Sequence, residues 1–303
     1  MNLPFITADE IRRTLSPAQA VAALQQRLVN DPPHADRPGR TFISVHAGEL
    51  LVMPDESESC VGLKLLSIAR ANPSHSLPAI QGIYLLMDAQ TLSPRALLDA
   101  AQLTCARTSA VSMLAATHLN PPSRPSVIVI GSGPQALAHC RASTLLDPSS
   151  IAVLARNHAA QEQLIRHAID EGITVVAADH DSLSSADVIV CCTTSRDPVI
   201  GASDVQTDVI IVAIGSHEPT ARELAADLFV DSFVVVESFT NARREAGDIV
   251  LAEAELKTGV INADLQELVT SSHAPSTGRR IFKSVGDAWE DLTIAEAISS
   301  RMS

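Results

Sequence analysis

Short apolar runs alternate with helical segments through the second part of the chain. The apolar runs cover residues 127–130, 151–154, 173–176, 188–192, 209–214 and 233–236. Strands that are buried on both faces read as continuous apolar runs, and strands that alternate with helices are typical of a parallel, doubly wound sheet. The pattern predicts an α/β fold class, with a Rossmann domain over residues 121–275.

The first part of the chain has a different pattern. Apolar extended runs at residues 50–53, 61–67 and 80–87 favour a mostly antiparallel sheet, and helical spacing predicts helices over residues 17–29 and 102–119. A proline-rich segment, residues 120–125, separates the two patterns. We expect an α+β domain over residues 1–120. Periodicity alone leaves open whether the C-terminal tail, residues 276–303, joins this domain.

Composition and charge narrow the class of protein. The chain has 303 residues, 46% of them hydrophobic and 19% charged, which predicts a compact protein of about two domains. Its net charge of -13 disfavours nucleic acids and anionic membranes as partners. We find no transmembrane or signal-peptide pattern and expect a cytoplasmic protein. The five cysteines lack metal-binding spacing, so we expect no metal site.

A glycine-rich turn follows the apolar run at residues 127–130 and precedes an alanine-rich helical segment. It consists of Gly131, Ser132, Gly133, Pro134, Gln135 and Ala136. In such a turn the first glycine permits a tight bend, the second leaves room for a pyrophosphate, and the helix N-terminus attracts the anion. The motif predicts dinucleotide binding. The alternative is a structural turn in a domain without a cofactor.

The end of the second predicted strand bears on the choice between the two nicotinamide cofactors. An acidic residue at this place binds the ribose of NAD, but here the strand is followed by Arg156 and Asn157. Because Arg156 suits a 2′-phosphate, we expect NADP(H) to be preferred, with NAD(H) still possible. Alternatively, Arg156 is an ordinary solvated residue.

Three cations in the first part of the chain are candidates for binding an anionic substrate. They are Arg40, Lys64 and Arg107. A lysine inside an apolar strand costs free energy unless a partner satisfies it, and an arginine suits a carboxylate. We expect Arg107 near a helix N-terminus. The alternative is that Lys64 extends from an edge strand to solvent and the arginines form surface ion pairs.

Taken together, these motifs resemble the ornithine cyclodeaminase/mu-crystallin family. The similar segments, from about residue 36 to 297, are PGRTFI, LLVMP, GLKLL, RANP with the following LP, LLDAAQLTCARTSA, IGSGPQA, VAIGSHEPTAREL, EAGDI and FKSVGDAWEDL. The resemblance implies a homodimer with a split α+β domain for substrate binding and dimerisation, built from residues 1–120 and 276–303. It places Arg40, Lys64 and Arg107 around a substrate carboxylate.

The resemblance also implies the remaining site residues. Asp291 matches an acidic position near the active site, although on a terminal helix it is equally explained by a structural hydrogen bond. Besides the glycine turn, Arg156 and Asn157, the cofactor contacts are expected at Thr193, Ala213, Ile214, Gly215, Ser284, Val285 and Gly286, the last three near the nicotinamide. Lys283 precedes this last segment, and we expect its side chain to point to solvent.

One departure from the family pattern bears on the reaction. His217 stands where cyclodeaminases and the related alanine dehydrogenases carry a catalytic aspartate, and Ala79 stands where a cyclodeaminase has a threonine that contacts substrate. We therefore expect NADPH-dependent reduction of a cyclic imine 2-carboxylate, an anionic small molecule, with Lys64 or His217 handling the proton. His217 is as well explained by a loop histidine without catalytic function. An open-chain amino- or imino-acid dehydrogenase, an ornithine cyclodeaminase and a non-catalytic NADPH-binding protein are the alternatives.

Overall fold

The computed structural model describes residues 3–33, 39–271 and 274–302. Contacts within the chain define two compact units: unit 1 comprises Met1–Thr108 and Asp287–Ser303, and unit 2 comprises Ser109–Gly286. The domain boundaries expected at 120/121 and 275/276 stay a prediction. Pro38, the first residue of the PGRTFI motif, lies outside the described residues.

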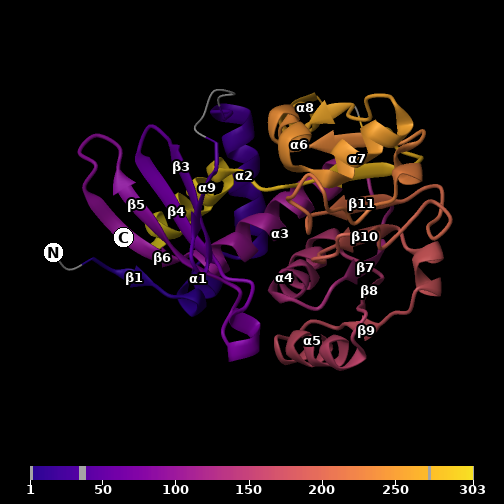
Figure 1. The fold of residues 1–303 in the computed structure, drawn as a ribbon, viewed down its shortest axis with the longest axis horizontal. Coiled ribbons are helices and arrows are strands. Elements are labelled where there is room, and N and C mark those ends of the chain that lie inside the picture. Colours follow the sequence, from indigo (N-terminus) through magenta and orange to yellow (C-terminus); the bar gives the residue numbers. More distant parts are fainter. Residues whose placement is uncertain (1–2, 34–38, 272–273, 303) are drawn as a thin grey trace. The chain divides into compact units, whose positions relative to one another are not determined.

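Unit 1 contains a six-stranded sheet (Figure 1). Its strand order is β1 (Phe5–Ile6), β6 (Pro94–Asp99), β5 (Ile80–Asp88), β4 (Cys60–Ile68), β3 (Gly48–Glu56) and β2 (Thr41–Val45). All neighbouring pairs are antiparallel except β1 and β6. Alternate residues of β4 are buried, so one face of this strand is covered. The antiparallel sheet predicted from the sequence is confirmed, with two central strands, β4 and β5, at its middle.

The other elements of unit 1 are helical. They are α1 (Ala8–Thr14), α2 (Pro17–Asn30), the first part of α3 (Ala100–His118), α9 (Ala288–Met302) and a short 3-10 helix η1 (Asn72–His75) before β5. Helix α9, yellow in Figure 1, packs against β3, β4 and α2. The C-terminal helix therefore supplies side chains to the sheet face on which Lys64 lies.

Unit 2 is built around an eight-stranded parallel sheet. Its order is β13 (Ala263–Asp264), β12 (Phe233–Val236), β14 (Arg280–Lys283), β11 (Ile210–Ala213), β10 (Val188–Cys191), β7 (Ser126–Ile130), β8 (Ser150–Leu154) and β9 (Val176–Ala177). The predicted parallel sheet is confirmed. The strand expected at residues 173–176 is wrong in extent, because Ile173 and Val175 are buried but only Val176 and Ala177 pair with β8.

Helices and short 3-10 turns connect these strands. They are α4 (Pro134–Ser143), η2 (Thr144–Leu146), α5 (His158–Asp170), η3 (Asp181–Ser185), η4 (Ala226–Phe229), α6 (Phe239–Glu245), α7 (Gly247–Leu256) and α8 (Leu265–Ser271). Strand β7 pairs with β8 on one side and with β10 on the other, so the chain changes direction across the sheet at this point. Ligands of parallel sheets bind outside the carboxyl ends of the strands at such a reversal. The glycine turn follows β7 directly.

No helix among residues 3–33, 39–271 and 274–302 is long and apolar enough to cross a membrane.

Candidate active site

A buried ion pair joins β4 to α9 in unit 1. Lys64 Nζ donates a hydrogen bond to Asp291 Oδ2 at 2.5 Å, and the two side chains are 1% and 0% exposed. Lys64 lies on the buried face of a central strand, so the edge-strand alternative for it is wrong. Asp291, in the first turn of α9, is one partner that satisfies the lysine inside the apolar strand.

Arg107 joins the same cluster from α3. Its Nη1 donates to Glu290 Oε2 at 2.8 Å, and its Nε lies 3.5 Å from Asp291 Oδ1. Glu290 is fully buried, and the sequence analysis did not identify it. Arg107 lies beyond the first turn of its own helix α3, which begins at Ala100, and the helix N-terminus beside it is that of α9. The structure thus brings together Lys64, Arg107 and Asp291.

The charges of this cluster set the protonation of Lys64. Burial lowers the pKa of Lys64 to about 8, the charge of Asp291 opposes that shift, and the charges of Arg107 and Arg40 add to it. Arg40, half-buried just before β2, is therefore close enough for its charge to act on Lys64. At neutral pH Lys64 is mostly an ammonium group that can donate a proton.

Tyr84 lies directly opposite Lys64 on the neighbouring strand β5. Its hydroxyl is buried, makes no hydrogen bond to any described residue, and lies so close over Gly62 that a Cβ there would be 1.8 Å from Tyr84 Oη. Burial raises the pKa of Tyr84 well above its usual value, and the charge of Asp291 adds to the shift. The sequence did offer a signal, since this is the only tyrosine of the chain and it stands within an apolar run.

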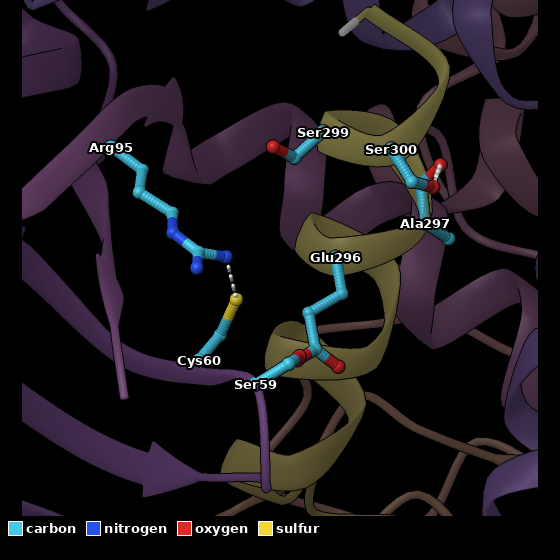
Figure 2. Close-up of a pocket in the computed structure, with 7 residues that line it drawn as sticks. All are labelled: Ser59, Cys60, Arg95, Glu296, Ala297, Ser299 and Ser300. Atoms are coloured by element: carbon cyan, nitrogen blue, oxygen red, sulfur yellow. Dashed lines mark hydrogen bonds between the residues drawn. The ribbon is translucent and has the colours of Figure 1, made fainter. Parts of the chain in front are cut away.

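A polar cavity of about 560 Å³ opens elsewhere in unit 1. Its lining includes Ser59, Cys60, Arg95 and Glu296, together with the last turns of α9 (Figure 2). Arg95 Nη1 donates to Cys60 Sγ at 3.1 Å, and Ser59 Oγ donates to Glu296 Oε1 at 2.7 Å. None of the residues that we predicted for the site lines this cavity.

The glycine turn in unit 2 has the shape that a pyrophosphate requires. Gly131 has a φ of +141°, and a Cβ there would lie 2.8 Å from the Cys192 carbonyl oxygen. A Cβ at Gly133 would meet nothing within 4 Å, so space lies open beside the turn. Helix α4 begins at Pro134 without a side-chain cap, and the fully buried Ala136 permits close packing. These residues fit the phosphates of a dinucleotide.

Arg156 and Asn157 lie between the second strand, β8, and helix α5. Asn157 caps α5 by accepting a hydrogen bond from the Ala160 amide at 3.2 Å. Arg156 is exposed, and no hydrogen bond or ion pair from it to another described residue is seen. Its guanidinium is therefore available to an anion.

Buried charges support the loops that follow β10 and β11. The Glu223 carboxylate accepts hydrogen bonds from the amides of Thr193, at 2.6 Å, and Gly215, at 2.7 Å. The amides of Glu223 and Leu224 donate to Asp248 Oδ1. Burial raises the pKa of Glu223. The carboxylate thus ties together two of the segments predicted to contact the cofactor.

Lys283 completes this network from the end of β14. Its Nζ donates to the Ser216 carbonyl oxygen at 2.7 Å and lies 2.8 Å from Asp248 Oδ2. The side chain is 1% exposed, so the expectation that it points to solvent is wrong. The physical reason is the position of β14 between β11 and β12, which surrounds the lysine with neighbouring strands.

A second carboxylate holds the segment after Lys283. Glu237, at the end of β12, accepts hydrogen bonds from Ser284 Oγ at 2.6 Å, the Gly286 amide at 2.7 Å and the Val285 amide at 3.1 Å. The sequence analysis missed Glu223, Asp248 and Glu237, because acidic residues at the ends of elements look like ordinary surface residues. Ala213 is buried at the end of β11, and the Ile214 amide donates to the Cys191 carbonyl oxygen.

His217 lies in the loop after β11 and is half-buried. It belongs to unit 2, whereas Lys64, Arg107 and Asp291 belong to unit 1. Its catalytic role, like the assignment of the substrate- and cofactor-binding residues, stays a prediction.

Comparison with known proteins decides the family. Residues 4–303 match the ornithine cyclodeaminase/mu-crystallin family. The chain belongs to this family. The family resemblance and the fold class expected from the sequence are thus confirmed.

Relatives in the family show the class of chemistry. Ketimine reductase mu-crystallin of Rattus norvegicus is 29% identical over 97% of this chain and 96% of its own length. The structure of Thermococcus litoralis Δ1-pyrroline-2-carboxylate reductase, in complex with NADH and L-proline, matches with a TM-score of 0.89 and 25% identity over 99% of this chain and 97% of that one. The structure of an archaeal alanine dehydrogenase dimer with bound NAD matches with a TM-score of 0.88 and 25% identity, over 99% of this chain and 96% of that one. The expected enzyme class, an NAD(P)H-dependent oxidoreductase acting on C–N bonds, is confirmed.

Proposed function

We propose that the protein reduces a cyclic imine 2-carboxylate with NADPH to the cyclic amino acid. The substrate would be pyrroline-2-carboxylate or piperideine-2-carboxylate, and the product proline or pipecolate. The observation that carries the proposal is the buried cluster of Lys64, Arg107 and Asp291 on the sheet of unit 1. The named reductase relatives, from rat and Thermococcus litoralis, support the same reaction class.

The cluster supplies what such a substrate requires. Arg107 and Arg40 would bind the carboxylate, for which the planar fork of arginine is suited. Lys64, protonated at neutral pH, would donate a proton or a hydrogen bond to the imine nitrogen, which makes the adjacent carbon electrophilic. Asp291 would hold the ammonium group in place through the 2.5 Å hydrogen bond.

The nicotinamide cofactor, when bound, supplies the hydride that reduces the imine carbon. Gly131 and Gly133 would make room for its pyrophosphate, and the amides at the start of α4 would bind this anion. Glu223 and Glu237 would fix the loops after β10, β11 and β14. Arg156 would bind a 2′-phosphate, which supports NADPH over NADH.

A second candidate is an open-chain amino-acid dehydrogenase, since the archaeal alanine dehydrogenase has nearly the same TM-score as the pyrroline-2-carboxylate reductase. It would use the same carboxylate cluster. His217 stands where cyclodeaminases and the related alanine dehydrogenases resemble one another in carrying a catalytic aspartate. This departure disfavours cyclodeamination and also counts against the dehydrogenase.

The test is a spectrophotometric assay of the purified protein. NADPH or NADH is mixed with each cyclic imine carboxylate, or with pyruvate and ammonia, and absorbance is followed at the reduced-nicotinamide band. We expect turnover of a cyclic imine with NADPH, loss of at least about 100-fold in kcat/KM in Lys64→Met, and no change in Lys257→Met, which alters an exposed lysine of unit 2. If the protein turns over pyruvate with ammonia but none of the cyclic imines, the result would support the dehydrogenase. If it binds NADPH but turns over no substrate, the result would support a non-catalytic binding protein.

A further inference from the structure

Negative charge gathers at the carboxyl ends of the strands in unit 2. The carboxylates of Glu223, Asp248 and Glu237 accept hydrogen bonds from backbone amides there, and Lys283 pairs with Asp248. Glu223, Asp248 and Lys283 are almost fully buried. Holding the loops in place does not require three carboxylates and one ammonium group. Neutral amides or hydroxyls would accept the same hydrogen bonds.

Among the described residues, no basic side chain pairs with Glu237. Both of its carboxylate oxygens accept, one from the Ser284 hydroxyl and the other from the amides of Val285 and Gly286. The segment from Ser284 to Gly286 thus surrounds the Glu237 carboxylate.

Under the proposed function, Glu237 would lie on the nicotinamide side of the dinucleotide site. In a doubly wound sheet the two mononucleotide halves of the cofactor bind on either side of the strand reversal. The glycine turn follows β7, and β8 carries Arg156 on the adenosine side. The other half of the sheet is formed by β10, β11 and β14, flanked by β12, at whose end Glu237 lies.

We propose that Glu237 favours the oxidised, positively charged form of the nicotinamide cofactor over the reduced, neutral form. This inference rests on the proposed function, because it requires that a nicotinamide cofactor binds. In the reduction, a hydride carries two electrons to the imine carbon, the C=N bond becomes a single bond, and the proton from Lys64 stays on the nitrogen. The nicotinamide ring gains one positive charge as it loses the hydride. A fixed carboxylate nearby lowers the free energy of that charged ring and so assists hydride donation.

Two substitutions separate the charge of Glu237 from its hydrogen bonds. In Glu237→Gln, the amide oxygen still accepts from the Val285 and Gly286 amides, and the amide nitrogen donates to Ser284 Oγ, so geometry is kept and charge is lost. In Glu237→Asp, charge is kept and the shorter side chain disturbs the geometry. Glu171→Gln is the matched control, because Glu171 is a carboxylate that follows α5 and pairs with Arg141.

The experiment measures dissociation constants for both redox forms of the cofactor at pH 8, where carboxylates are ionised. Calorimetry gives the constants for NADP⁺ and NAD⁺, and nicotinamide fluorescence those for NADPH and NADH. In Glu237→Gln we expect the constant for the oxidised form to rise about three- to tenfold and that for the reduced form to change less than about twofold. Glu237→Asp and Glu171→Gln should keep the wild-type ratio of the two constants.

Equal weakening of both redox forms in Glu237→Gln would overturn the inference and leave Glu237 as a residue that only holds the loop. The same conclusion follows if Glu237→Asp changes the ratio as much as Glu237→Gln does. Circular dichroism and melting temperatures check that each variant is folded. If the wild-type protein binds neither redox form, the proposed function itself fails, which is a different outcome from an unchanged ratio.

Discussion

At the scale of single residues, Lys64 links the buried cluster to the pH dependence of catalysis. Its pKa of about 8 means that the ammonium form is lost as the pH rises above this value. If that form protonates the imine, kcat/KM should fall above about pH 8. Asp291→Asn removes the charge that most raises the Lys64 pKa, so the fall should begin at least about one pH unit lower.

The imine of the substrate also titrates. The pH profiles of the variants show whether the fall in kcat/KM is caused by Lys64 or by the imine. Substrate titration is the same for every variant, so a fall that stays in place in Asp291→Asn would contradict the role of Lys64. Glu296→Gln is the control, because this carboxylate lies on the same helix but accepts hydrogen bonds from Ser57 and Ser59. Its profile should match that of the wild type.

Arg156 is predicted to decide between the two cofactors. Arg156→Ala should lower kcat/KM for NADPH about tenfold or more and leave that for NADH within about twofold, because only NADPH carries the 2′-phosphate. Arg166→Ala serves as the control, since Arg166 is an exposed arginine of α5 that pairs with Glu162. If Arg156→Ala lowers kcat/KM equally for NADPH and NADH, Arg156 has a role in the fold or at the surface and does not select the cofactor.

The site residues that could be predicted from the sequence differ from those that could not in where their partners lie along the chain. Lys64 was found because a charge inside an apolar strand needs a partner, and the glycine turn because its backbone conformation and open space call for glycine. Glu290, Glu223 and Glu237 were missed. Each is explained only by a partner far along the chain, which a single sequence does not identify.

At the scale of elements, apolar runs locate strands but not their partners. The run at residues 80–87 became β5, whereas in the run at 173–176 Ile173 and Val175 are buried without joining the sheet. Strand β14 lies between β11 and β12, although many residues separate it from both in the chain. Parallel pairing depends on such distant contacts, so periodicity left the place of the C-terminal tail open.

The packing of α4 makes a prediction about stability. His139 is fully buried, with Nδ1 2.7 Å from the Gln135 carbonyl oxygen and Nε2 2.9 Å from Ser112 Oγ. Burial lowers its pKa from 6.5 to about 4. As the pH falls through this window, the unfolded chain binds the proton before the folded protein does. The free energy of unfolding should therefore decrease between about pH 6.5 and pH 4, by about 3 kcal/mol at most.

Urea unfolding at pH 7 and pH 5 measures this contribution. His139→Leu should lower stability at pH 7, because Ser112 loses its partner, and should show a smaller decrease between the two pH values. His167→Leu, at an exposed position of α5, should keep the wild-type decrease. An identical decrease in His139→Leu would mean that other groups cause the acid sensitivity.

At the scale of the whole molecule, the outer strand β2 of unit 1 indicates self-association. Phe42, Ile43 and Val45 are 43%, 47% and 45% exposed, and within the described residues β2 pairs only with β3. An edge strand that exposes apolar side chains is a site for pairing with another chain. The homodimer that the sequence resemblance implies stays a prediction, and β2 is the strand on which we expect the second copy to bind.

Sedimentation equilibrium tests this expectation with two matched substitutions, each of which replaces an exposed apolar side chain by lysine. Ile43→Lys should convert a species of twice the chain mass into one of the single-chain mass, because a lysine on an edge strand opposes pairing. Val176→Lys places the same charge on β9, the outer strand of the sheet in unit 2, where the side chain is 53% exposed, and should leave the dimer intact. A dimer that survives Ile43→Lys but dissociates in Val176→Lys would move the interface to unit 2, and a monomeric wild type would refute the dimer altogether.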